Sequence, residues 1–150
     1  GPTRTFSPMG RNTVYCGIDH GTKRIGLAVS NPEGTMASPV SAVDARGPAD
    51  QVILRVIHAV GGFDIDEWVV GLPLNMDGTE GEQAGHARRF GRHLTQATGK
   101  PVHYWDERLS SESASDRLAG ADLTRKKKKA RRDAVAAQVI LQSFLDAQPG

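Results

Sequence analysis

Residues 14–30 read VYCGIDHGTKRIGLAVS, and this stretch decides the fold. Two apolar runs, 14–19 and 25–30, have the length and composition of buried strands. Gly21 permits a tight turn between them, so the stretch predicts a β-hairpin whose first strand ends on an acid, Asp19.

The elements after this hairpin predict a mixed sheet. A third strand is expected over 37–43, where Pro39 favours an edge position or a bulge. The further expected elements are a helix around 53–60, a strand over 67–71, a helix opened by a capping box from Thr79 to Glu82 with Gln83 on its core stripe, a strand over 102–106, a short helix capped by Ser110 or Ser111, and a last helix over about 131–147. Short turns join the first three strands and helices join the later ones, so both antiparallel and parallel neighbours are expected. The sequence predicts an α/β fold with one five-stranded mixed sheet flanked by helices.

Length and composition restrict the class of protein. A chain of 150 residues is long enough for one domain, expected over 13–150 after a flexible arm at 1–12. Gly1-Pro2 indicates the remnant of a protease cleavage site in a recombinant protein. No apolar run approaches the roughly 20 residues of a membrane helix, and the single cysteine, Cys16, excludes an intrachain disulfide. We therefore expect a protein of the reducing cytoplasm without a membrane partner.

Three acids lie at the ends of predicted elements. Asp19 ends the first strand, and Glu107 follows the fifth. Asp133 lies four residues before Ala137, on the apolar stripe of the last helix. If that helix packs across the carboxyl edge of the sheet, three carboxylates converge, and their mutual repulsion favours a bound cation. Oxygen ligands of this kind suit Mg²⁺ or Mn²⁺ better than zinc.

Each acid also has an ordinary explanation. Asp133 is a good residue to cap the last helix. Asp19 could bond to the backbone of the turn at Gly21, and Glu107 could pair with Arg108.

The basic residues are unevenly distributed. The net charge is only +2, but a large share of the 19 Lys and Arg residues falls in 125–132, RKKKKARR, directly before Asp133. We favour this block as a contact with a nucleic-acid backbone over a solvated loop. Arginine and lysine next to the acids are candidates for the same role, or for balancing the charge of Asp19 and Glu107. The candidate nucleic-acid-binding residues are Lys23, Arg24, Arg108, Lys126, Lys127, Lys128, Lys129, Arg131 and Arg132.

Three residues near the acids carry weaker signals. Tyr104 and Trp105 alternate along a strand, so we expect one ring to face the core and the other to face outward, where it could stack on a base. A lone histidine is more often structural, so His20 is kept out of the catalytic set.

Four motifs resemble those of the YqgF/RuvX family of Holliday-junction-resolvase-like proteins. In chain order they are Ile18-Asp19-His20-Gly21-Thr22-Lys23-Arg24-Ile25-Gly26, Gly71-Leu72-Pro73-Leu74-Asn75-Met76-Asp77-Gly78-Thr79-Glu80, Asp106-Glu107-Arg108-Leu109-Ser110-Ser111 and Asp133-Ala134-Val135-Ala136-Ala137-Gln138-Val139-Ile140-Leu141. The resemblance implies a ribonuclease H-like fold and a nuclease that matures the 5′ end of precursor 16S ribosomal RNA. It also implies that Asp19, Glu107 and Asp133 are the catalytic, metal-binding acids, holding Mg²⁺ or Mn²⁺ for phosphodiester hydrolysis.

Other functions remain open at the level of sequence. A junction resolvase acting on branched DNA needs two active sites and therefore a dimer, but the sequence shows no clear dimer stripe, so a monomer or weak homodimer is expected. A non-catalytic RNA-binding factor of ribosome assembly is a second alternative. A phosphotransferase fragment is a third, although 150 residues hold only one of the two domains that it needs. The expected partners are pre-rRNA or branched or single-stranded DNA.

Overall fold

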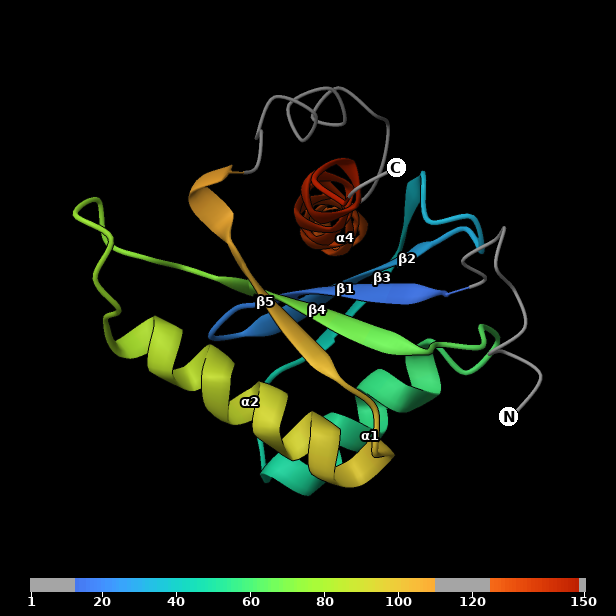
Figure 1. Cartoon of the computed structure of the whole chain (residues 1–150). Helices are drawn as coiled ribbons and strands as arrows, with labels where there is room; N and C mark the ends of the chain where they lie inside the picture. The colour runs from blue at the N-terminus through green and yellow to red at the C-terminus, as the bar shows by residue number, and fades with distance from the viewer. Residues whose placement is uncertain (1–12, 110–124, 149–150) are drawn as a thin grey trace.

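The computed structural model describes residues 13–109 and 125–148, which form one sheet between two helical layers (Figure 1). In chain order the elements are β1 (Tyr15–His20), β2 (Arg24–Ser30), β3 (Ala37–Asp44), α1 (Ala49–Ala59), β4 (Glu67–Leu72), α2 (Glu82–Thr98), β5 (Val102–Asp106), the short 3₁₀ helix η2 (Glu107–Leu109) and α4 (Arg125–Asp146). Helices α1 and α2 cover one face of the sheet, and α4 crosses the other face (Figure 1). The predicted five-stranded mixed sheet flanked by helices is confirmed.

The strand order β3-β2-β1-β4-β5 places the hairpin beside a parallel unit. β1 pairs antiparallel with β2, and β2 with β3, whereas β1, β4 and β5 run parallel. Their apolar sequences suit strands that are covered on both faces. The carboxyl ends of β1, β4 and β5 therefore meet at one edge of the sheet, where ligand sites of α/β proteins collect.

Pro39 is expected to mark an edge position or a bulge, and β3 has both. Pro39 pairs with Ala28, and the register shifts between Leu27 and Ala28. Proline has no N–H to donate to a ladder, so an irregular edge strand accommodates it at low cost.

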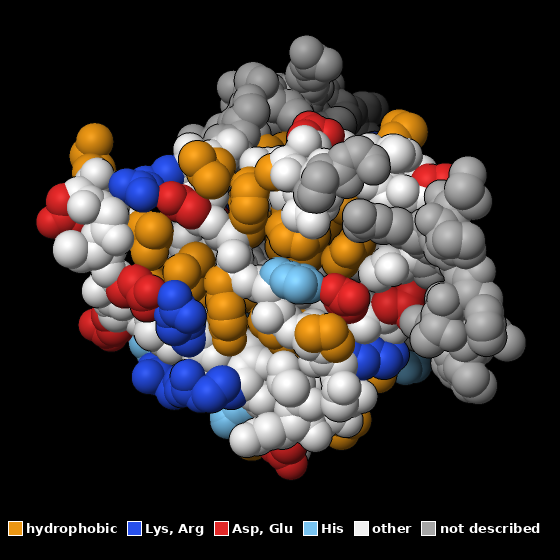
Figure 2. Space-filling model, in the orientation of Figure 1, with side chains coloured by type: hydrophobic (Ala, Val, Ile, Leu, Met, Phe, Trp, Pro, Cys, Tyr) orange, Lys and Arg blue, Asp and Glu red, His pale blue; other side chains and the backbone are white. Residues whose placement is uncertain are grey.

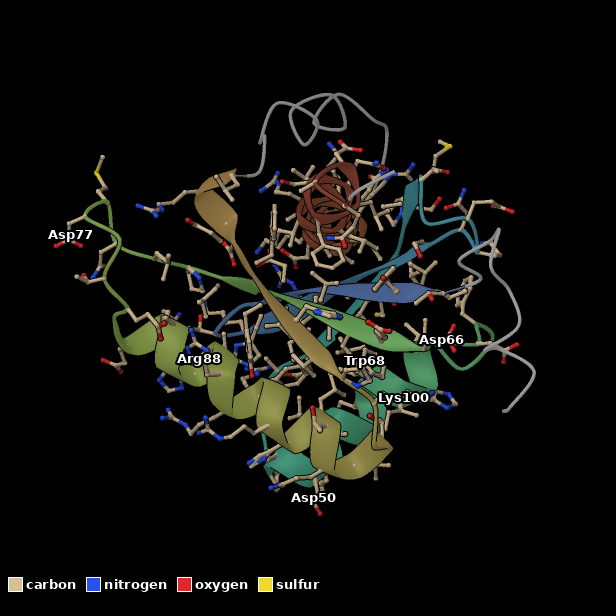
Figure 3. The ribbon with its side chains drawn as sticks, viewed as in Figure 1. Asp50, Asp66, Trp68, Asp77, Arg88 and Lys100 are labelled. Carbon is tan, nitrogen blue, oxygen red and sulfur yellow. The ribbon has the colours of Figure 1, made fainter. Side chains whose placement is uncertain are left out.

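The layer of α1 and α2 is built from large side chains. Ile18, Leu27 and Trp68 are all buried in this layer, together with Val56 of α1 and Leu94 of α2. Figure 3 shows Trp68 between the sheet and this layer, where its Nε1–H donates to Thr98 Oγ1 at 3.2 Å.

The layer of α4 includes large side chains such as Phe144, but the sheet presents glycines where the helix crosses β1 and β2. A Cβ added at Gly17 of β1 would lie 2.6 Å from Leu141 Cβ and 3.0 Å from the Ala137 carbonyl oxygen. One added at Gly26 of β2 would collide with the carbonyl of Asp133. The backbone of α4 therefore lies almost directly on β1 and β2.

Two helix starts differ from the prediction. Helix α4 begins at Arg125 rather than near 131, because Lys, Arg and Ala are good helix formers and continue the last helix toward the N-terminus. The basic block is therefore helical, not a loop. The predicted capping box is wrong: α2 has Gly81 at its N-cap and no side-chain cap bond, while Thr79 bonds to Asp77 in the preceding loop.

The prediction that one ring of β5 faces outward is also wrong, because helices cover both faces. Tyr104 points to α2: its hydroxyl donates to the Arg88 carbonyl at 3.1 Å, and Arg88 lies 4.8 Å from its ring centroid. Trp105 points to α4, where its Nε1–H donates to Ser143 Oγ at 2.9 Å.

Two expectations fall outside the described part of the chain. These are the N-terminal arm at 1–12 and the short helix after Ser110 or Ser111. Among the residues that are described, no helix combines the length and apolarity needed to cross a membrane.

Candidate functional site

The candidate site lies on the α4 face, at the carboxyl edge of the sheet. Asp19 has the same strand parity as Tyr15 and Gly17, which contact α4, so its side chain is directed to that face. Asp19 pairs with Gly26 of β2, and Gly26 is where the backbone of Asp133 touches the sheet. The contact at Gly26 therefore places Asp133 beside Asp19.

The pKa of Asp19 reflects its burial and the nearby charge of Asp133. Burial, and then the charge of Asp133, raise the pKa of Asp19 from its usual 3.8 to about 6. At neutral pH this carboxyl group is ionised, but its ionisation costs free energy because of burial and repulsion. A nearby cation would offset that free energy.

Arg24 supplies one positive charge to this pair of acids. Its Nε donates to Asp133 Oδ2 at 2.5 Å, across 109 residues of sequence. The hairpin holds Arg24 at the start of β2, because the Gly21 N–H donates to the Arg24 carbonyl at 3.0 Å. Arg24 therefore balances Asp133, whereas the sequence suggested Asp19 or Glu107.

Two ordinary explanations of the acids are excluded by this geometry. Asp133 lies in the third turn of α4, so it does not cap the helix. The Gly21 N–H is bonded to Arg24, so the turn does not depend on Asp19.

Glu107 lies beside the end of β4. A Cβ added at Gly71 would be 2.8 Å from Glu107 Oε2 and 2.7 Å from Ile140 Cδ1 of α4. Ile18 of β1 pairs with Val70 of β4 in parallel register. The next residues along the two strands, Asp19 and Gly71, are therefore neighbours. The carboxylates of Asp133, Glu107 and Asp19 thus gather over three adjacent strands, β2, β4 and the intervening β1, on one face.

The three acids lie near one another, but their carboxylates do not converge on one metal-binding point in this structure. Within residues 13–109 and 125–148, no three Asp, Glu, His or Cys side chains form a ready-made metal-binding group. All three candidates are half-buried, and Asp133 is engaged by Arg24. The donor set consists of carboxylate oxygens, which is the chemistry that hard divalent ions prefer.

Arg108 is anchored beside this edge. It forms a two-pronged pair with Asp106, with Nη2 to Oδ2 at 2.8 Å, which holds the pKa of Asp106 below its usual value. Its Nη1 also donates to the Met76 carbonyl at 3.3 Å in the β4–α2 loop. Asp77 in this loop projects beyond the sheet (Figure 3), and Arg108 fixes the loop to η2.

The other candidate basic residues lie around the start of α4. Lys23, Lys129, Arg131 and Arg132 are exposed, and Lys128 is half-buried. Lys126 and Lys127 lie in the helix, but their side chains are outside the described part. Figure 2 shows basic and acidic side chains interspersed along the side of the molecule formed by the β4–α2 loop and α2, rather than a field of one sign.

The comparisons with known proteins agree with this architecture. The sequence model of the family described as "RuvX: Holliday junction resolvase" matches residues 13–147. The chain belongs to the RuvX family. Among curated RuvX relatives, a protein of Moorella thermoacetica is 44% identical over 87% of this chain and 92% of its own length, and one of Pelotomaculum thermopropionicum is 40% identical over 88% and 86%. Both carry the name "Putative pre-16S rRNA nuclease".

Solved structures place the RuvX chain in a known fold. Thermus thermophilus RuvC in complex with a Holliday junction substrate superposes with a TM-score of 0.55 at 16% identity, covering 90% of this chain and 94% of that one. A second Thermus thermophilus RuvC structure gives 0.51 at 18% identity. The predicted ribonuclease H-like fold and the family resemblance are both confirmed.

Proposed function

We propose that this protein is a divalent-metal-dependent nuclease that hydrolyses phosphodiester bonds in 5′-end maturation of pre-16S rRNA in the cytoplasm. The observation that carries the proposal is the half-buried pair Asp19 and Asp133, held together at Gly26 at the carboxyl edge of the sheet. Relatives that share about two-fifths of the sequence over nearly the whole chain carry the name of such a nuclease.

The acids are the proposed ligands of the cation. Asp19, Glu107 and Asp133 would hold Mg²⁺ or Mn²⁺, and the bound metal would supply a water-derived nucleophile and stabilise the leaving 3′-oxygen. The raised pKa of Asp19 supports this assignment, because a cation at this position would remove the repulsion from Asp133.

Arg24 has two proposed tasks in this scheme. Without substrate it neutralises Asp133. With a cation at the acids, Asp133 no longer needs the guanidinium, and Arg24 can turn to a phosphate oxygen next to the scissile bond. An exchange of this kind keeps the site electrically balanced in both states.

The N-terminal part of α4 is the proposed backbone contact. Lys129, Arg131 and Arg132 are exposed within about one turn of Asp133, so a nucleic-acid strand bound there lies close to the acids. Such contacts release counterions, and log Kd should depend steeply on log salt. Replacing Lys126 to Lys129 by alanine should reduce that slope, and an unchanged slope would remove the basic block from the interface.

The test is a cleavage assay with matched variants. Labelled pre-16S rRNA, single-stranded DNA and a four-way junction are incubated with Mg²⁺, Mn²⁺ or EDTA. The expected result is metal-dependent cleavage of the rRNA precursor that Asp19→Asn, Glu107→Gln and Asp133→Asn each abolish. Asp64→Asn is the control, because Asp64 is exposed and precedes β4, at the opposite end from the acids.

The other outcomes separate the alternatives. Preferential cleavage of the four-way junction would favour a resolvase, the class of protein that the family description names. It would also predict a dimer rather than the proposed monomer or weak homodimer. Binding without cleavage of any substrate would favour a non-catalytic assembly factor.

A further inference from the structure

A cavity of about 710 Å³ lies on the face of the sheet opposite the three acids. It is bounded by the end of β1, the β3–α1 loop, the start of α1 and the first three turns of α2. Its apolar floor is formed by the buried residues Val52, Ile53 and Phe90, and the exposed residues Gln83 and Arg89 lie at its rim. Its volume falls in the range of roughly 300–1,000 Å³ that is usual for small-ligand pockets.

His20 links this cavity to the candidate active site. Successive side chains of a strand point to opposite faces, so Asp19 faces α4 while His20 lines the cavity. The ring of His20 lies 4.9 Å from that of Phe90. Its Nδ1 is buried and has no hydrogen-bond partner among the described residues, which is unusual for a purely structural histidine.

Helix α2 lines the cavity with polar groups that can hold an anion. His86, Arg89 and His93 lie on its cavity side. Arg89 Nη2 is 3.2 Å from His86 Nδ1, and the exposed carboxylate of Glu82 is 3.7 Å from His86 Nε2. The expectation that Gln83 belongs to the core stripe is wrong, because Gln83 is exposed and stands over the opening.

We propose that this cavity binds a nucleotide, with the base against Phe90 and His20 and the phosphate at Arg89. Aromatic faces stack on any base, and imidazole and amide edges can pair with the polar edge of a base. Arginine binds phosphate through two parallel hydrogen bonds. The apolar floor with its aromatic rings matches the nucleobase, and the exposed guanidinium at the polar rim matches the phosphate.

The nucleotide can come from two sources. One is a free nucleoside monophosphate, which is independent of the nuclease activity. The other is an unpaired nucleotide of the RNA substrate, and this source rests on the proposed function. Asp19 and His20 are consecutive residues at the end of β1, so a strand that places a base in the cavity passes the edge that carries the acids.

The first experiment measures free nucleotides in EDTA, so that binding does not depend on a metal or on cleavage. AMP and UMP are titrated into the full chain, and histidine ring signals are followed by ¹H–¹⁵N NMR. The chain has five histidines; we expect the signals of His20, His86 and His93 to shift, and those of His58 and His103, which do not line the cavity, to stay.

Matched variants locate the binding. Arg89→Ala should weaken binding by about tenfold or more, as loss of a charge-assisted bond does. Gln83→Trp should abolish it by filling the opening from an exposed helical position. Arg92→Ala removes the same charge from an exposed position of α2 outside the cavity, and it should leave the affinity unchanged.

The second experiment tests the RNA source. Pre-16S RNA containing 4-thiouridine is photocrosslinked in EDTA, and crosslinks are expected in the peptide that carries His86 and Phe90, and should be lost in Gln83→Trp. Binding in either experiment, with the expected variant pattern, supports the cavity. Absence of cavity histidine shifts with AMP and UMP, together with absence of RNA crosslinks to the peptide of His86 and Phe90, overturns it. Equal weakening of nucleotide binding by Arg92→Ala and Arg89→Ala also overturns it. Cleavage of RNA by wild type together with such negative results would leave the nuclease proposal standing.

Discussion

The two faces of the sheet are covered in different ways. At the crossing of α4 over β1 and β2 the strands present Gly17 and Gly26, and there the helix lies almost directly on the strand backbone. Under α1 and α2 they present Ile18, Leu27 and Trp68, and large side chains separate the helices from the sheet.

The difference explains where polar groups can be placed accurately. On the α4 face the position of Asp133 is set by a main-chain contact with Gly26, which has almost no freedom. On the other face the separation is filled by side chains, and at the carboxyl edge it leaves the cavity that His20 lines. The α4 face therefore holds the carboxylate of Asp133 in a defined position, whereas the α1 and α2 face leaves space for a ligand.

The largest expected effect comes from removing bulk on the α1 and α2 face. Trp68→Ala should lower the free energy of unfolding by about 3–5 kcal/mol, as large-to-small core substitutions do, because Trp68 is 2% exposed. Urea denaturation measures the change. Met76→Ala is the control: Met76 is 98% exposed, so its loss should stay within about 0.5 kcal/mol. A Trp68→Ala loss as small as the control would refute the view that side-chain bulk supports this face.

Adding bulk should be the damaging change on the α4 face. Gly26→Ala puts a methyl group into the Asp133 carbonyl and should cost about 1–3 kcal/mol or more. It should also reduce cleavage, because Asp133 must move. Gly62→Ala is matched to it, since nothing lies within 4 Å of a Cβ there. Equal denaturation curves for the two variants would mean that α4 is not held by backbone contact.

Asp19→Asn should stabilise the metal-free protein at alkaline pH while abolishing cleavage. The pKa of Asp19 is raised to about 6 in the folded state, so the folded protein keeps a proton that the unfolded chain loses. Stability should therefore fall as pH rises from about 4 through 6, by up to about 3 kcal/mol at 1.36 kcal/mol per pKa unit. The variant lacks this fall. Denaturation in EDTA at pH 4.5 and 8 checks it, with Asp64→Asn as the reference; parallel pH profiles for both variants would contradict it.

The smallest expected effect concerns the ion pair on the α4 face. Arg24→Gln should lower stability by about 1 kcal/mol or less, because the pair is partly exposed and screened. It should also raise the pKa of Asp19 further, since Asp133 loses its neutralising partner. Carboxyl ¹³C NMR follows that titration. Arg46→Gln removes an exposed pair with Asp44 and should leave the Asp19 titration unchanged; an equal shift there would remove Arg24 from the site.

Local sequence patterns were sufficient for much of the architecture. The hairpin, the edge position of Pro39 and the burial of the Ala137 stripe on α4 follow from periodicity and turn chemistry, which depend on near neighbours. The placement of Asp133 on that stripe also identified the face on which the acids meet.

Two of the features that the sequence did not predict depend on contacts between distant residues, and a third depends on competition within a loop. Arg24 pairs with a residue 109 positions away, and no local pattern encodes that choice. The sequence predicted Gly26 only as a strand residue. The structure shows that a glycine is needed there because α4 crosses so closely that a Cβ would collide with the Asp133 carbonyl. Thr79 had the right spacing for a capping box, but Asp77 competes for its hydroxyl in the loop.

The position of α4 in the chain sets the order in which the site is completed. The five strands of the described part of the chain precede α4, and Asp133 is translated last of the three acids. Domains generally fold as units during synthesis, and a growing chain that ends before α4 still lacks the third carboxylate. For a protein with the proposed activity, hydrolysis of RNA begins only after the chain has moved far enough from the ribosome that is making it.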